Sequence, residues 1–409
     1  MQNWHLCKSV AVRRCIATSL RIHYSLFPQM SFLENIYHRF ESKSTAFLAN
    51  KYWQWRVVAV AVVAMLLSFF NNLSPLKDFK SYYEEVIVKK GEYFLYNVTK
   101  DRSQNLTEHR VYEEPASNNR VFRLTLPVII RVFHIRHVSI FIYGLQLLLG
   151  ILLYFLLTRF LFQILHDKLA TMLAVIALAC IYFGSSFFIE NGGYGDFYTF
   201  FFLFLSIYFR NPLLVFLALF TATWCDERAV VAGSLVFAYW WIAEKIKEDK
   251  PISFVPNRQM LAIIAAEIAY ISLRYYLMTY QGMEGTYKKG EFTEQLFASL
   301  PSFGFKFTWI LEGFWLVMLL AFLILYLKKD YFKLLIVFGG TIAMIISGFT
   351  TYDSTRSGSF VFPMIFLGLI TVKTKLTENE MRIFLLLVAL LCFLHPLANK
   401  THGVGYFLM

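Results

Sequence analysis

Carboxylate and arginine side chains gather in four short polar segments, each at the end of an apolar stretch. Carboxylates in such segments can act as general bases or orient substrate hydroxyl groups, and arginine can bind phosphate through two parallel N–H donors. If the segments share one side of a membrane, they could form a polar chamber for an anionic substrate. The segments are Asp78, Glu190-Asn-Gly-Gly-Tyr-Gly-Asp196, Asp226-Glu227-Arg228 and Asp353-Ser-Thr-Arg356.

Each polar segment also has a purely structural explanation. Asp78 falls in the first turn of an expected helix, where the helix dipole favours a carboxylate. The glycines between Glu190 and Asp196 permit a simple hairpin. Arg228 could pair with a neighbouring carboxylate, and Arg356 could extend to lipid headgroups. Residue types and spacing leave both explanations open at every segment.

The composition indicates a membrane protein. Of 409 residues, 57% are hydrophobic and 16% are charged, whereas soluble domains average about a quarter charged. A helix needs about 20 apolar residues to cross the hydrocarbon layer. The sequence therefore predicts an all-α polytopic membrane protein with about eleven transmembrane helices. The expected spans are 57–73, 138–158, 169–189, 195–209, 212–226, 229–243, 260–279, 307–327, 332–349, 358–372 and 383–398.

Lysine and arginine in the short loops predict the orientation. The loops that would be inner if the N-terminus is cytoplasmic carry about twice as many of these residues as the outer ones. We therefore expect a cytoplasmic N-terminus, an extracytoplasmic C-terminus and a bacterial inner (plasma) membrane. With this orientation all four polar segments face the outside.

The same topology predicts the division of the chain. Residues 1–56 form a cytoplasmic tail, with Met30 as an alternative start to Met1, and 57–398 form the membrane domain. Residues 399–409 form an extracytoplasmic tail. The first extracytoplasmic loop, 74–137, should hold interfacial amphipathic helices, one between Pro75 and Gly91 and one near Pro127, with a flexible loop over 97–119.

Charge and cysteine usage exclude several classes of protein. The net charge of +12 comes from residues spread over tails and loops, which favours contact with membrane lipids and not with nucleic acid. The five cysteines show no CxxC pair, so we expect neither a disulfide framework nor a thiolate metal site. A divalent metal ion bound by carboxylates remains an open alternative to a site without a cofactor.

Several motifs match one family of membrane enzymes over about residues 57–370. They are Asp78-Phe-Lys-Ser-Tyr-Tyr, Gly192-Gly-Tyr-Gly-Asp196, the break Arg210-Asn-Pro212, Trp224-Cys-Asp-Glu227-Arg-Ala-Val-Val, and Asp353-Ser-Thr-Arg356 continuing to Pro363. In these features the chain resembles the polytopic C-superfamily glycosyltransferases (GT-C fold), which use polyprenyl-phosphate-linked sugars. It departs from them because no Asp-x-Asp or Asp-Glu pair directly follows the first span.

The resemblance implies transfer of a sugar from a lipid-linked donor to a glycan, lipid or protein acceptor at the extracytoplasmic face. Asp78 would be the general base, and Asp196 and Glu227 would orient sugar hydroxyls or a divalent ion. Arg356, with Arg228 or Arg274, would hold the departing phosphate. The remaining residues expected to bind substrate are Glu190, Asp226 and Asp353.

Two other functions remain open. One is a transporter or flippase for a lipid-linked or anionic solute, favoured by Glu267 near the middle of a span. The other is a catalytically inactive scaffold in glycan assembly. The transporter predicts that Glu267 is the most sensitive acidic residue, whereas the transferase predicts that Asp78 is.

Overall fold

The structure is a computed structural model that describes residues 28–70, 75–107, 120–283, 291–351 and 353–394. The chain divides into two compact units, residues 1–53 and 54–409. The first contains α2 (Pro28–Leu48). The tail expected at 399–409 and most of the segment 1–29 lie outside the described residues.

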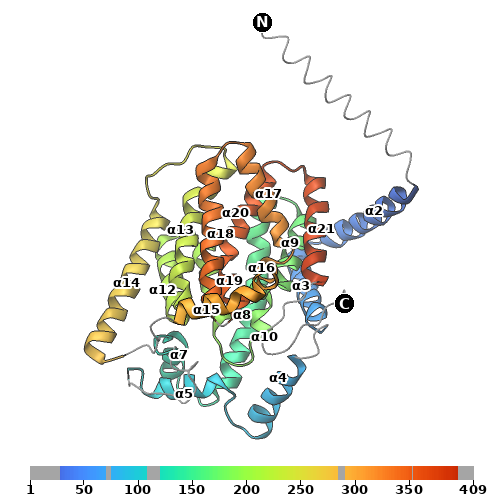
Figure 1. Ribbon diagram of the computed structural model, residues 1–409. Coiled ribbons are helices and arrows are strands. Elements are labelled where there is room, and N and C mark those ends of the chain that lie inside the picture. The colour runs from blue at the N-terminus through green and yellow to red at the C-terminus, as the bar shows by residue number, and fades with distance from the viewer. Residues whose placement is uncertain (1–27, 71–74, 108–119, 284–290, 352, 395–409) are drawn as a thin grey trace. The chain divides into compact units, whose positions relative to one another are not determined.

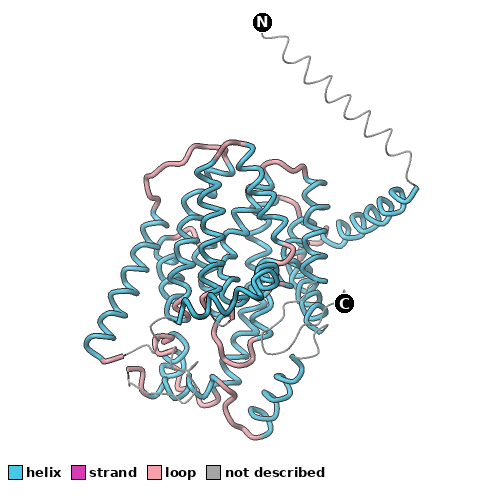
Figure 2. The backbone as a smooth tube through the Cα atoms, in the orientation of Figure 1, coloured by secondary structure: helices cyan, strands magenta, loops and turns pink. Residues whose placement is uncertain are grey.

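In its described residues the second unit consists of helices joined by loops, without a strand (Figure 2). This matches the all-α expectation. The helices from α3 onward are α3 (Trp53–Phe70), α4 (Pro75–Tyr82), α5 (Leu95–Gln104), α7 (Thr125–Val132), α8 (Val138–Leu165), α9 (Lys168–Cys180), α10 (Tyr182–Ile189), α11 (Asp196–Tyr208), α12 (Pro212–Cys225), α13 (Arg228–Lys247), α14 (Arg258–Gln281), α15 (Glu291–Ser299), α16 (Phe303–Leu311), α17 (Phe314–Leu327), α18 (Tyr331–Phe349), α19 (Ser354–Gly358), α20 (Phe362–Lys373) and α21 (Glu378–Leu394).

The expected count of eleven spans is not confirmed. By length and composition, six described helices could cross a membrane, or seven if α9 and α10 form one bent span. The apolar helices α11, α12 and α17 have only 13, 14 and 14 residues, fewer than the roughly 20 that a full crossing needs. Several long apolar helices nevertheless indicate an integral membrane protein.

The bundle is centred on the helical stretch that contains α19 and α20. Within Ser354–Lys373, 94% of an 18-residue apolar segment is buried inside the protein, whereas only 28% of the corresponding segment of α14 is. Figure 1 shows α20 between α13, α17 and α18, whereas α14 lies at the edge. The stretch that begins with α19, the short helix of Arg356, is therefore largely buried inside the bundle.

The bend between α9 and α10 has a packing cause. The two helices meet at 56° across Ile181. A Cβ on Gly184 would lie 2.0 Å from the carbonyl oxygen of Leu178, so only glycine permits this close approach. The bend begins α10 at Tyr182, whose hydroxyl reaches Glu190.

The segment expected as the first extracytoplasmic loop packs against one end of the bundle. Figure 1 shows α4, α5 and α7 together at the end where α19 lies. A helix over Pro75–Tyr82, extended by a π-helical turn, confirms the first amphipathic helix. The flexible loop expected over 97–119 is wrong in its first part, because 97–104 belong to α5. The side chains of Leu95 and Tyr96 are buried there.

Glu92 fixes this segment to α8. Its carboxylate accepts hydrogen bonds from the backbone N–H groups of Val138 (3.0 Å) and Ser139 (2.7 Å) and from the Ser139 hydroxyl (2.7 Å). These donors lie at the start of α8, where backbone N–H groups lack helical partners. Glu92 therefore caps α8 from a distant part of the chain.

Candidate functional site

The turn between α10 and α11 places Asp196 inside the protein. Gly193 and Gly195 both adopt left-handed backbone angles, with φ of +79° and +85°, which strongly favour glycine. A Cβ on Gly193 would lie 3.0 Å from the Tyr96 ring, so the turn packs directly on α5. Asp196 begins α11 and is fully buried.

Asp196 is bound by two arginines from distant parts of the sequence. Its Oδ1 accepts a hydrogen bond from Arg228 Nη2 at 2.6 Å. Its Oδ2 accepts two from Arg356, from Nε at 2.8 Å and from Nη2 at 2.6 Å. The sequence expectation that Asp196, Arg228 and Arg356 share one region is confirmed by these contacts.

Asp226 holds the second half of the same network. It pairs with Arg228 through two hydrogen bonds of 2.8 and 2.7 Å, and with Arg123 Nη2 at 2.8 Å. Burial raises the pKa of Asp226, but the charges of Arg123 and Arg228 outweigh it and lower that pKa below its usual range. Glu227 is more accessible and pairs with Arg123 Nε at 3.4 Å.

Arg356 is positioned by a short helix that packs closely on α18. Asp353 caps α19 by accepting from the Arg356 backbone N–H at 3.3 Å, and its Oδ2 lies 3.4 Å from Arg356 Nη1. A Cβ on Gly348 would lie 2.8 Å from the backbone nitrogen of Gly358. Since only glycine allows this approach, the two helices fix the direction of the Arg356 side chain.

Glu190 differs from the other carboxylates of the site. Its side chain accepts hydrogen bonds from the Tyr182 hydroxyl and from the Phe197 backbone N–H, and Arg356 Nη2 is 3.9 Å away. Burial, and then the charge of Asp196, raise the pKa of Glu190 to about 8. Burial and the neighbouring charge of Asp196 therefore favour the protonated form of Glu190.

Two arginines of the site were not singled out by the sequence. Arg120 and Arg123 precede α7 and donate to backbone carbonyls of the glycine turn, with Tyr194 O accepting from both at 3.2 and 3.3 Å. The Tyr194 ring lies beneath Arg356, whose Cζ is 4.0 Å from the ring centroid. The three-residue spacing of Arg120 and Arg123 was the available signal, since it places both on one side of a turn.

Arg120 differs from the other three arginines of the cluster in its partners. Among the described residues it forms no ion pair with a carboxylate, and its Nη1 donates only to carbonyls. Burial, and then the charges of Arg123 and Arg356, lower the pKa of Arg120 to about 9. The side chain stays charged at neutral pH, so an anion placed beside it would be strongly favoured.

A small cavity lies beside Arg120 and Arg123. Its volume is about 30 Å³, enough for about one water molecule. The indole N–H of Trp224, which also lines the cavity, is buried and finds no hydrogen-bond partner among the described residues. This donor, together with the two guanidinium groups, makes the cavity suited to a hydrogen-bond acceptor of negative charge.

Asp78 and Arg274 lie outside the ion pairs described above. Asp78 is half-buried in α4. Burial raises the pKa of Tyr93, and the charges of Asp78 and Tyr194 raise that pKa further. Arg274 donates to the Tyr270 hydroxyl at 2.7 Å and stacks on Phe122, with its Cζ 4.2 Å from the ring centroid. Arg274 thus packs on residues beside Trp224, which lines the small cavity, whereas Asp78 is linked to the cluster through its charge on Tyr93.

The site combines acidic and basic side chains in similar number. Five carboxyl groups lie beside four arginines; they are Glu190, Asp196, Asp226, Glu227 and Asp353, and Arg120, Arg123, Arg228 and Arg356. In the described part of the chain, no group of three or more His, Cys, Asp or Glu residues could hold a metal ion. Because arginines occupy the oxygens of Asp196 and Asp226, these residues do not fit a divalent ion.

The arrangement is therefore a cluster of arginines whose guanidinium groups are held in place by the buried carboxylates of Asp196 and Asp226. Comparison with known proteins adds no further identification: no family model, no curated protein and no solved structure matches the chain. The fold and the site define an all-helical integral membrane protein with a buried ionic cluster at one end of its bundle.

Proposed function

We propose that the protein is a membrane glycosyltransferase of the GT-C type, which transfers a sugar from a polyprenyl-phosphate donor to an acceptor at the extracytoplasmic face. The observation that carries the proposal is the convergence of four arginines around Asp196 and Tyr194. A lipid-linked donor releases a phosphate whose negative charge grows as the glycosidic bond breaks. Arginines fixed before the reaction can stabilise that charge without reorganising.

The contacts divide the roles among the acidic residues. Asp196 and Asp226 are positioning residues, because each is buried and neutralised by two arginines. Asp78 is the general base of the proposal, as the family resemblance implies, and its charge acts on Tyr93, which is also affected by Tyr194 of the glycine turn. Asp353 and Glu227 are partly exposed, with side-chain exposures of 24% and 19%, and are available to orient the hydroxyl groups of the sugar.

The arginines provide the first test of the transferase. Arg356→Lys and Arg120→Lys should each lower sugar transfer at least about 10-fold, because an ammonium cannot reproduce two parallel donors. The assay measures transfer of labelled sugar from polyprenyl phosphate in membranes that carry each variant. Arg131→Lys is the control, since Arg131 is exposed in α7. Wild-type transfer that survives both substitutions would contradict the proposed phosphate site.

A second function, transport of a lipid-linked or anionic solute, is favoured by one buried acid. Both carboxyl oxygens of Glu267 are buried without a hydrogen-bond partner among the described residues. The carboxyl group packs on α13, because a Cβ on Gly233 would lie 2.1 Å from Glu267 Oε1. Ionisable groups inside a membrane span often belong to proton or substrate pathways.

Glu267→Gln separates the two functions. The transferase predicts nearly unchanged sugar transfer, because glutamine is a close isostere of glutamate and no ion pair involves Glu267 within the described residues. The transporter predicts that this substitution is the most damaging one in the chain. Transfer is measured in membranes and solute flux in proteoliposomes, with Glu294→Gln as an exposed control. The transport function would be supported if Glu267→Gln abolishes solute flux while Asp78→Asn leaves it unchanged.

A further inference from the structure

A second pocket lies at the opposite end of the bundle from the arginine cluster. It has a volume of about 210 Å³ and is bordered by the C-terminal ends of α8, α13 and α20 and by the turn between α11 and α12. These helix ends are distant from Asp196, Arg228 and Arg356, which lie at the other ends of α11, α13 and the stretch 354–373. The pocket is therefore separate from the proposed transferase site.

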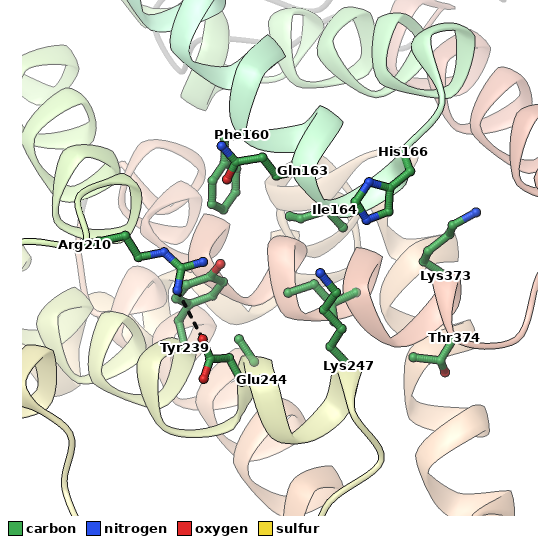
Figure 3. A pocket seen from close by; sticks show the side chains of 12 residues that line it. Phe160, Gln163, Ile164, His166, Arg210, Tyr239, Glu244, Lys247, Lys373 and Thr374 are labelled. Carbon is green, nitrogen blue, oxygen red and sulfur yellow. Dashed lines mark hydrogen bonds and ion pairs between the residues drawn. The ribbon is translucent and has the colours of Figure 1, made fainter.

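The pocket carries an excess of positive charge. Its charged lining consists of Arg210, Lys247 and Lys373 against a single carboxylate, Glu244. Three positive charges less one negative charge leave two, with His166 counted as neutral. Figure 3 shows Arg210 and Lys373 on opposite sides of the view, with Lys247 between them.

The one ion pair among the charged lining residues leaves the two lysines uncompensated. Glu244 pairs with Arg210 Nη1 at 3.1 Å, and the Arg210 Cζ lies 5.6 Å from the Trp240 ring centroid. Neither Lys247 nor Lys373 forms an ion pair with a carboxylate anywhere in the described part of the chain. Two ammonium groups that border one cavity repel each other unless an anion lies near them.

The deeper wall of the pocket is apolar. Phe160, Ile164 and Ile370 line it together with the two lysines, and Phe160 and Ile370 are at most 7% exposed. The ring of Tyr239 forms part of the same wall. A ligand that fits this lining has an anionic group at the charged rim and an apolar or neutral part against the wall.

We propose that this pocket binds the phosphate monoester of an anionic ligand, with Lys247, Lys373 and Arg210 around the phosphate. A phosphate monoester carries a charge of about −1.5 to −2 at neutral pH, which matches the net charge of the lining. The volume suits a headgroup and excludes a whole drug-sized ligand, which needs about 300 Å³ or more. The phosphate can belong to a lipid headgroup of the adjacent leaflet or to a soluble compound.

The test uses the full-length protein in nanodiscs of zwitterionic lipid, with short-chain phosphatidate and inorganic phosphate as separate probes. Lys247→Gln and Lys373→Gln should each weaken binding about tenfold, as expected for loss of a charged donor. Lys245→Gln is the matched control, because it removes the same charge from the same helix outside the pocket. Glu244→Gln should tighten binding, since it frees Arg210 and adds to the positive charge.

The two probes identify the source of the phosphate. Binding of phosphatidate alone assigns the pocket to a lipid headgroup, and equal binding of inorganic phosphate assigns it to a soluble ligand. The proposal is overturned if neither probe binds saturably, or if Lys245→Gln weakens binding as much as the pocket variants do. The outcome does not depend on sugar transfer, so this site and the transferase can fail separately.

Discussion

Asp196→Asn should lower the free energy of unfolding by about 3–5 kcal/mol, the range measured when one partner of a buried ion pair is removed. Asp196 is fully buried and accepts from both Arg228 and Arg356. Loss of its charge leaves two guanidinium groups inside the protein with reduced compensation. Denaturant titration of the purified protein in detergent measures the change.

The matched control is Asp353→Asn, which removes a carboxylate from the same cluster. Asp353 keeps 24% side-chain exposure and its ion pair with Arg356 is 3.4 Å long, so the expected loss is about 1 kcal/mol or less. Equal stability of the two variants would show that Asp196 does not hold the arginines. Asp196 would then return to the group of candidate catalytic residues, as the sequence first placed it.

Asp78→Asn should reduce sugar transfer by about 10²–10⁴-fold, which is the contribution of a positioned general base. Its fold should survive, because an amide at a helix N-terminus replaces a carboxylate at little cost. The measurement is transfer of labelled sugar from polyprenyl phosphate, normalised to the amount of folded protein in the membrane. A large loss of transfer without a loss of stability distinguishes the base from a structural residue.

The control for Asp78 is Glu84→Gln, on the same helical segment. Glu84 is exposed and pairs with Lys80 at 3.8 Å, so its substitution should leave transfer unchanged. If Asp78→Asn retains full activity, the base must be sought among Glu227 and Asp353, the partly exposed carboxylates of the cluster. Asp196 is the weaker alternative, because its oxygens are occupied.

The sequence by itself determined which residues could gather at one end of the bundle. The polar segments at Glu190, Asp226 and Asp353 interrupt long apolar runs. If the runs between them cross the membrane in alternating directions, these segments lie on the same side. The contacts of Asp196 with Arg228 and Arg356 confirm that grouping. The sequence also predicted the amphipathic helix at Pro75–Tyr82, because amphipathic patterning depends on local spacing.

Features that depend on helix length and on packing were harder to predict. A helix does lie at the expected span 195–209, but α11 has only 13 residues, so that it crosses a membrane is not confirmed. The run 97–119 looked like a loop because it is polar, yet α5 forms there. Leu95 and Tyr96 are buried because they pack on the glycine turn at Gly192 and Gly193, a part of the chain that is distant in sequence.

Only the tertiary structure decided which carboxylates are buried and neutralised by arginines and which stay partly exposed. A sequence shows that Asp226 and Arg228 are neighbours, but it does not show that Arg123 completes the pair from the other side. The chemistry of a carboxylate depends on the charges within a few ångströms of it and on its burial. Those neighbours come from the segment before α7, the turn between α12 and α13, and the helices α11, α13 and α19, whose packing no local pattern encodes.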